Sequence, residues 1–111
     1  MPTSADQARI QEAERLIRAV PHTHPVAILP VGSRAIGTAR PDSDLDLVVI
    51  LPDAEVTREN WGALYRALTR LDVEVDVLVY GQSRVAEWSG LPANPLRHAF
   101  EIAGLPLEPL Q

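Results

Sequence analysis

Residues 44–51 read DLDLVVIL, and this stretch decides how the rest of the chain is interpreted. Five aliphatic residues in a row, closed by Pro52, are typical of a buried strand. Side chains two apart in a strand lie on the same face, so Asp44 and Asp46 point the same way. Two carboxylates this close repel each other unless a cation lies between them. Because oxygen ligands without His or Cys favour a hard ion, the pair predicts a magnesium site.

A glycine–serine pair precedes this strand. Residues 26–31 form a short apolar run, expected to be a buried strand, and Gly32 and Ser33 follow it directly. Glycine lets the backbone turn sharply and approach a ligand without a Cβ in the way. Ser33 and the amides after it, at the start of an expected short helix, can donate hydrogen bonds to phosphate oxygens. This segment therefore predicts a phosphate-binding turn.

A third carboxylate follows on the next predicted strand. Residues 73–79 read VEVDVLV, which alternates as a strand with one apolar face does. Asp76 could complete the site with Asp44 and Asp46 if the two strands are neighbours, as a metal ligand or a general base. Glu74 shares its face and is the competitor for this role. We favour Asp76 because its apolar neighbours place it deeper in the strand.

Each of these features alone is weak. A Gly-Ser pair after a strand is more often an ordinary turn, and an Asp-x-Asp pair is often a solvated strand face. Their order along the chain, turn, loop, paired carboxylates, helix and third carboxylate, favours one catalytic site over a coincidental set of surface acids.

The composition limits the class of protein. The 111 residues are 46% hydrophobic, which suits one domain, residues 1–111, with a real core. A net charge of -5 argues against direct nucleic-acid binding. The chain has no cysteine, hence no disulfide or thiolate zinc site. No apolar run approaches membrane-spanning length and no targeting segment is apparent, so we expect a cytoplasmic protein that makes no membrane contact.

The remaining patterns predict a small α/β (α+β) fold. We expect a mixed sheet of three to five strands with helices packed mainly on one face. The expected helices run from Ser4, as cap, to about Val20; from Thr57, as cap, to Leu71; over residues 83–89; and from Asn94 to Gly104. His22 and His24 lie two apart between prolines without a third ligand, which favours a surface loop.

The motifs resemble a known family. The segments GSRAIG (32–37), SDLDLV (43–48) and VDV (75–77) are similar to the signature of the polymerase-beta-type nucleotidyltransferase superfamily. The spacing of ten residues between Ser33 and Asp44, together with the short chain, is most similar to its minimal nucleotidyltransferase (MntA-like) branch. The resemblance covers about residues 26–80 with specific motifs.

The resemblance implies a site and a reaction. It assigns the nucleotide triphosphate, ATP, to Gly32 and Ser33, and Mg²⁺ to Asp44 and Asp46. It makes Asp76 the residue that completes the metal site and activates the nucleophile. Family members often have a basic residue at the position of Ile36. Arg34 or Arg40 could supply that charge here, and we include Arg34 among the expected nucleotide-binding residues.

The resemblance also implies a partner. The branch commonly acts as the antitoxin of a toxin–antitoxin pair and adenylylates a helical HEPN-type ribonuclease toxin, so the first hypothesis is a protein adenylyltransferase antitoxin. A minimal catalytic domain would borrow acceptor-binding surface from such a partner or from a second copy of itself. The alternatives are transfer to a small hydroxyl compound such as an aminoglycoside, and a non-catalytic module that masks a partner.

Overall fold

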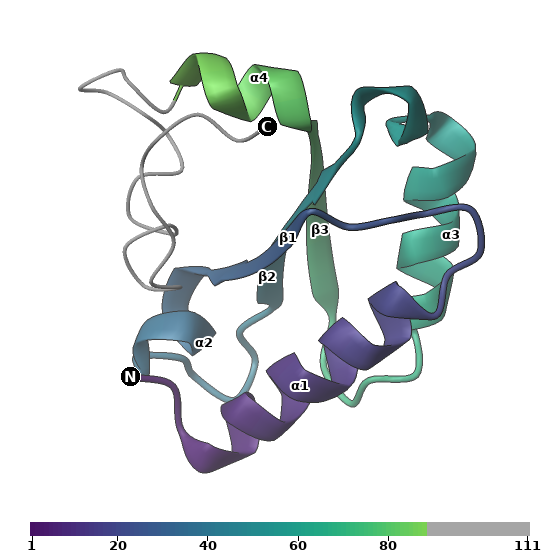
Figure 1. Ribbon diagram of the computed structural model, residues 1–111. Helices are drawn as coiled ribbons and strands as arrows, with labels where there is room; N and C mark the ends of the chain where they lie inside the picture. The colour runs from purple at the N-terminus through teal and green to yellow at the C-terminus, as the bar shows by residue number, and fades with distance from the viewer. Residues whose placement is uncertain (89–111) are drawn as a thin grey trace.

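The computed structural model describes residues 1–88, which form three strands and four α-helices (Figure 1). The elements are α1 (Ser4–Arg18), β1 (Ala27–Val31), α2 (Gly32–Ile36), β2 (Leu45–Leu51), the 3₁₀ turn η1 (Asp53–Glu55), α3 (Arg58–Leu68), β3 (Val75–Gly81) and α4 (Gln82–Trp88). The helix expected from Asn94 to Gly104 lies outside the described residues.

The sheet is mixed, as the sequence predicts. Its strand order is β1-β2-β3, with β1 antiparallel and β3 parallel to the central strand β2. Asp46 on β2 is in register with Val31 on one side and Asp76 on the other. The two predicted strands that carry carboxylates are therefore neighbours, which the sequence left open.

The central strand is buried on both faces. Its aliphatic residues are at most 1% exposed, and they divide by alternation between two clusters. Leu47, Val49 and Leu51 pack with α1, α3 and β3, whereas Val48 and Ile50 pack with β1 and with Val85 of α4. Each such side chain contributes about 1.5–3 kcal/mol on burial. A strand that is buried on both faces has apolar residues at successive positions. The apolar run at residues 47–51 therefore predicts this strand from the sequence.

The two long helices cover one face of the sheet, and the short helix α4 lies toward the other face. Figure 1 shows α1 and α3 together on one side of the sheet, and α4 lies toward the other. The prediction of helices mainly on one face is thus confirmed for the two long helices. Among residues 1–88, no helix is long and apolar enough to span a bilayer.

Several element boundaries differ from the sequence-based expectation. Thr3, not Ser4, caps α1 by accepting a hydrogen bond from the Asp6 amide. Thr57 caps α3 as expected, but the helix ends at Leu68 rather than Leu71. The third strand begins at Val75 rather than Val73, because it pairs only along the length of β2, from Leu45↔Val75 onward. Pairing partners set these ends, and local sequence does not carry that information.

Candidate active site

The predicted carboxylates gather at the start of β2 and β3. Asp46 and Asp76 are in register on adjacent parallel strands, where backbones run about 4.8 Å apart. Asp44 lies just before β2, two residues from Asp46 and so on the same face. That face is opposite the one that α1 and α3 cover, since Leu45, Leu47 and Val77 point to those helices. Asp44 and Asp76 are exposed, and Asp46 is half-buried between them.

The three carboxylates interact electrostatically at Asp46. Partial burial raises the pKa of Asp46 above its ordinary 3.8, and the charges of Asp76 and then Asp44 raise this pKa further. Glu74 precedes β3 and lies outside its register with β2, whereas Asp76 is paired with Asp46. This coupling favours Asp76 over Glu74 as the third carboxylate of the site.

Gly32 brings the backbone of the turn against the same carboxylate. Its φ of +74° is one that residues with a Cβ rarely adopt, and a Cβ built there would lie 2.5 Å from Asp46 Oδ2. β1 ends at Val31, directly opposite Asp46, so Gly32 and half-buried Ser33 follow at the edge of the acidic site. Only glycine allows both the turn and this close approach. The structure thus brings Gly32, Asp46 and Asp76 together, as the resemblance implies.

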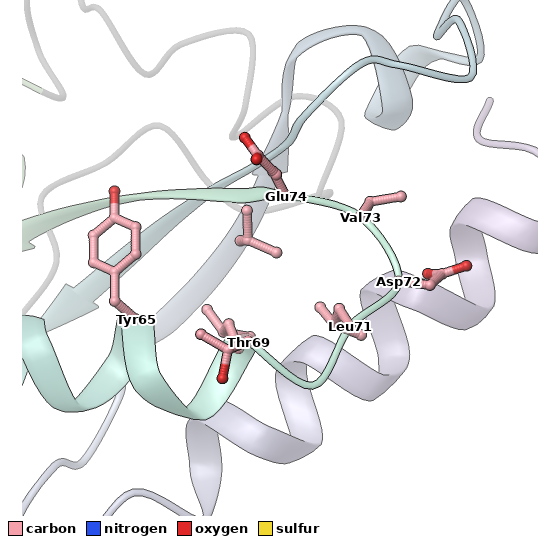
Figure 2. Close-up of a pocket in the computed structure, with 8 residues that line it drawn as sticks. Tyr65, Thr69, Leu71, Asp72, Val73 and Glu74 are labelled. Atoms are coloured by element: carbon pink, nitrogen blue, oxygen red, sulfur yellow. The ribbon is translucent and has the colours of Figure 1, made fainter.

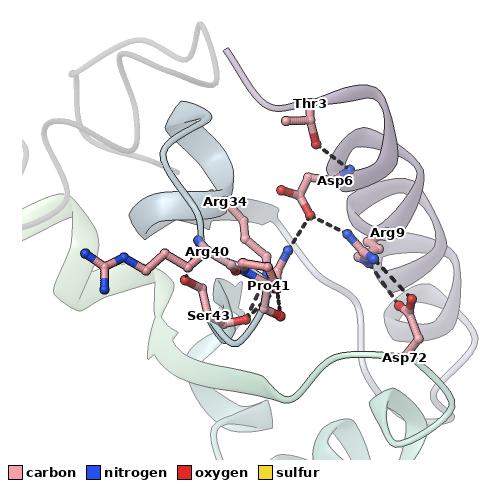
Figure 3. A network of polar contacts seen from close by, with 8 residues as sticks. All are labelled: Thr3, Asp6, Arg9, Arg34, Arg40, Pro41, Ser43 and Asp72. Atoms are coloured by element: carbon pink, nitrogen blue, oxygen red, sulfur yellow. Dashed lines mark hydrogen bonds and ion pairs between the residues drawn. The ribbon is translucent and has the colours of Figure 1, made fainter.

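Arg34 lies elsewhere, in a buried ion network. It is 4% exposed, and its Nη1 donates a 2.9 Å hydrogen bond to Asp6 Oδ1 (Figure 3). Its Nε and Nη2 donate to the Ser43 carbonyl, at 2.9 and 2.7 Å, and Nη2 also reaches the carbonyls of Pro41 and Arg40. Since this guanidinium already serves Asp6 and the loop, we leave Arg34 out of the nucleotide-binding residues proposed below.

The network fixes the loop that carries Asp44. Arg34 holds the carbonyl of Ser43, the residue before Asp44, and the Ser43 hydroxyl accepts a hydrogen bond from the Arg40 amide. Figure 3 shows the Arg40 side chain extending away from this network. Ile36, the position at which the resemblance implies a basic residue, is 42% exposed and so lies at the surface. Of the two arginines that could supply the positive charge, Arg34 is buried in the network, and the exposed Arg40 is the one whose side chain can reach a phosphate.

Asp6 is a structural residue that sequence reasoning missed. Burial alone would raise the pKa of Asp6, but hydrogen bonds and charges from Arg9 and Arg34 hold this pKa below its ordinary 3.8. Arg9 in turn binds Asp72 at 2.9 and 3.1 Å, which ties α1 to the segment before β3. Asp6 in the first turn of an amphipathic helix is typical of a surface residue, so its sequence position gave no signal.

Two aromatic residues of α3 were also missed as neighbours of the site. Tyr65 donates a 3.1 Å hydrogen bond to Asp76 Oδ1, and Trp61 Nε1 donates a 3.0 Å hydrogen bond to the Val77 carbonyl. The sequence predicts core or edge packing for Trp61, which is 36% exposed and contacts the edge strand β3. The four-residue spacing of Trp61 and Tyr65 on one helix face was the available signal.

An open cavity of about 480 Å³ adjoins the site between the end of α3 and the start of β3. Half of its lining residues are aliphatic, and the polar ones are Tyr65, Thr69, Asp72 and Glu74 (Figure 2). Asp44, Asp46 and Asp76 do not line it. Asp72 turns toward α1, where Arg9 binds it, whereas the Glu74 carboxylate has no partner among residues 1–88.

The donor set fits magnesium through two carboxylates. Within residues 1–88, no three acidic or His side chains are arranged to hold a metal ion together, and Asp76 is engaged by Tyr65. Magnesium is usually bound by one or two carboxylates, with waters and substrate phosphates completing its six positions. Asp44 and Asp46, beside the Gly32 turn, satisfy that requirement, and Asp76 keeps a second oxygen that can complete the site, as the resemblance implies.

Comparison with known proteins identifies a family. The family model described as "Nucleotidyltransferase domain" matches residues 13–99, most of the chain. The matched region contains the glycine–serine turn and all three aspartates. No curated protein is similar enough to count as a match.

Proposed function

The chain belongs to the nucleotidyltransferase domain family, and on that premise we propose that it transfers AMP from ATP to a hydroxyl group of another protein, with magnesium. The observation that carries the proposal is the meeting of the Gly32 turn, Asp46 and Asp76 at one end of the sheet. Phosphates held at the turn lie beside carboxylates that can bind their counterion. A transferase that moves a nucleotide needs this combination.

Each residue has a role in the proposed reaction. Gly32 and Ser33 bind the triphosphate, and Asp44 and Asp46 would hold magnesium, which would offset the charge of the phosphates. The acceptor oxygen forms a bond to the α-phosphorus, the bond from that phosphorus to the bridging oxygen breaks, and pyrophosphate leaves. Asp76 takes the proton of the acceptor hydroxyl. The products are the adenylylated acceptor, pyrophosphate and one proton.

The proposed acceptor is a protein, specifically a small helical ribonuclease toxin of the HEPN type. The motif resemblance to the minimal, MntA-like branch supports this choice. The exposure of Asp44 and Asp76 also supports it, because a hydroxyl on the surface of another protein can reach Asp76. The chain would then act as the antitoxin that silences its partner by modification.

A second acceptor class has one observation in its favour. The cavity beside β3 carries the carboxylate of Glu74, which has no hydrogen-bond or ion-pair partner within residues 1–88 and suits a cationic compound with hydroxyl groups, such as an aminoglycoside. Glu74 lies two residues before Asp76 in the same segment, so a compound bound in the cavity would lie close to Asp76. This reading predicts that Glu74→Gln weakens the binding of such a compound.

Intact-protein mass spectrometry tests both acceptors. The chain is incubated with ATP, magnesium and the protein encoded by its neighbouring gene, and in parallel with an aminoglycoside. The proposal expects a mass increase of one AMP on the neighbouring protein, absent with Asp44→Asn and present with Asp42→Asn, an exposed acid of the same loop. AMP on the aminoglycoside alone would select the second acceptor. A stable complex without any transfer would indicate a masking module and overturn the proposed reaction.

A further inference from the structure

The Tyr65 hydroxyl lies at the outer edge of β3 with three neighbours. It is 3.1 Å from Asp76 Oδ1, 3.1 Å from the Val77 amide nitrogen and 3.4 Å from the Val77 carbonyl oxygen. β3 is the edge strand of the described sheet, and α3 places Tyr65 across that edge. The hydroxyl therefore links the backbone of the edge strand to a carboxylate of the site.

The donors and acceptors around the Tyr65 hydroxyl determine which of them receives its proton. The Val77 amide can only donate, so the tyrosine oxygen accepts from it. The Val77 carbonyl already accepts from Trp61 Nε1 at 3.0 Å, shorter than its distance from Tyr65. A hydroxyl has one proton, and a carboxylate is the stronger acceptor. Tyr65 thus donates to Asp76.

We infer that Tyr65 is a positioning residue that orients Asp76 toward the acceptor hydroxyl. One oxygen of the exposed Asp76 is fixed at the strand edge, and the second is left for the reaction. Asp46 lies opposite Asp76 on the neighbouring strand and the two carboxylates repel each other, so without Tyr65 the exposed Asp76 side chain would turn away to other rotamers. The inference rests on the proposed function, in which Asp76 takes the proton of the acceptor hydroxyl.

Trp61 provides a matched control. It comes from the same face of α3 one turn earlier, binds the same residue of β3, and is equally exposed, at 36% against 37% for Tyr65. Trp61→Phe removes one hydrogen bond to Val77 without touching Asp76. Tyr65→Phe removes the bond to Val77 and the bond to Asp76. Any effect of merely loosening the strand edge appears in both variants.

Two measurements test the inference. The first is pyrophosphate release from ATP and magnesium in the presence of the neighbouring gene's protein. We expect Tyr65→Phe to lower kcat about tenfold, since small misplacements of a reacting group slow chemistry, with the KM for ATP within about twofold of wild type. Trp61→Phe should keep the wild-type kcat. The second is the carboxyl-carbon NMR resonance of Asp76, which should shift in Tyr65→Phe and stay in place in Trp61→Phe.

The outcomes separate this inference from the proposed function. Equal kcat in the two variants, or a rise in the KM for ATP at constant kcat, would overturn the positioning role. An unshifted Asp76 resonance in Tyr65→Phe would show that the contact does not exist in solution. If wild type releases no pyrophosphate with any acceptor, the proposed function fails, and the NMR resonance alone still decides whether Tyr65 holds Asp76.

Discussion

Asp46 is the residue at which the charges of the site meet, and its raised pKa has a consequence for stability. Burial and the charges of Asp76 and Asp44 disfavour its ionised form in the folded chain. Below about pH 3.8, its ordinary pKa, Asp46 is protonated and does not lower the free energy of unfolding. As the pH rises through the higher pKa of the folded state, Asp46 ionises and the free energy of unfolding falls. At neutral pH without metal, the carboxylate therefore destabilises the fold.

The corresponding prediction concerns Asp46→Asn. Without metal, the variant should unfold at a higher temperature than wild type at pH 7, and this difference should vanish below about pH 3.8. Nucleotidyl transfer should fall at least about 100-fold. Thermal melts across pH, with EDTA present, measure the first effect. A variant that is less stable than wild type at pH 7 would contradict the electrostatic account, and full activity would contradict the metal assignment.

Arg34 illustrates a residue whose role the sequence could not reveal. The sequence predicts roles for Gly32 and the three aspartates because a few neighbouring residues are enough to indicate a turn or a pair of carboxylates on one strand face. Asp6, the partner of Arg34, lies 28 positions earlier in the chain. The motif context suggested a phosphate ligand, whereas the fold uses Arg34 to satisfy a buried carboxylate and three loop carbonyls.

Removing Arg34 should therefore destabilise the fold. Arg34→Met leaves Asp6 buried with Arg9 alone, and breaking a buried ion pair in this way costs about 3 kcal/mol. The low pKa of Asp6 also means that its contribution is present above pH 3.8 and is lost as the pH falls through the folded-state value. Urea unfolding at pH 7 and at acid pH measures both effects. Arg40→Met, a neighbouring exposed arginine, is the control that should change stability little, and an equal loss in both variants would contradict the network's role.

At the scale of elements, the sequence predicts which segments form strands but not how they are joined. Alternation and apolar runs identified β1, β2 and β3 within two residues at their starts. That β3 lies parallel to β2, with Asp76 opposite Asp46, follows from long-range pairing that no local pattern encodes. The sequence predicts which acids belong to the candidate site, and the register adds that Asp46 and Asp76 lie side by side.

The junction of β1 and α2 allows a test at this scale. Gly32→Ala places a Cβ at φ +74° and 2.5 Å from Asp46 Oδ2, so the junction or the carboxylate must move. The expected loss is about 1–3 kcal/mol of stability, typical of a residue held at a strained φ, together with loss of transfer. Thermal unfolding and pyrophosphate release check the two effects.

Gly62 gives the contrasting case for the same substitution. It lies inside α3, where an added Cβ meets only the end of the flexible Arg66 side chain, at 3.2 Å. Gly62→Ala should raise stability by about 0.5–1 kcal/mol through helix propensity. If Gly32→Ala were as stable and as active as Gly62→Ala, the close approach of the turn to Asp46 would have no functional meaning.

At the scale of the whole molecule, binding of the nucleotide should be coupled to folding. The net charge of -5 includes the carboxylates that repel one another at the site, and a bound metal–nucleotide complex would relieve that repulsion. A ligand that binds only the folded chain raises its stability by about 2.7 kcal/mol at 100 times its Kd. ATP with magnesium should therefore raise the melting temperature of wild type, whereas ATP with EDTA should raise it far less.

The rise in melting temperature should be lost in Asp46→Asn and retained in Asp42→Asn. An equal gain in Asp46→Asn would mean that the nucleotide binds away from the carboxylates, and the site as proposed would then be wrong.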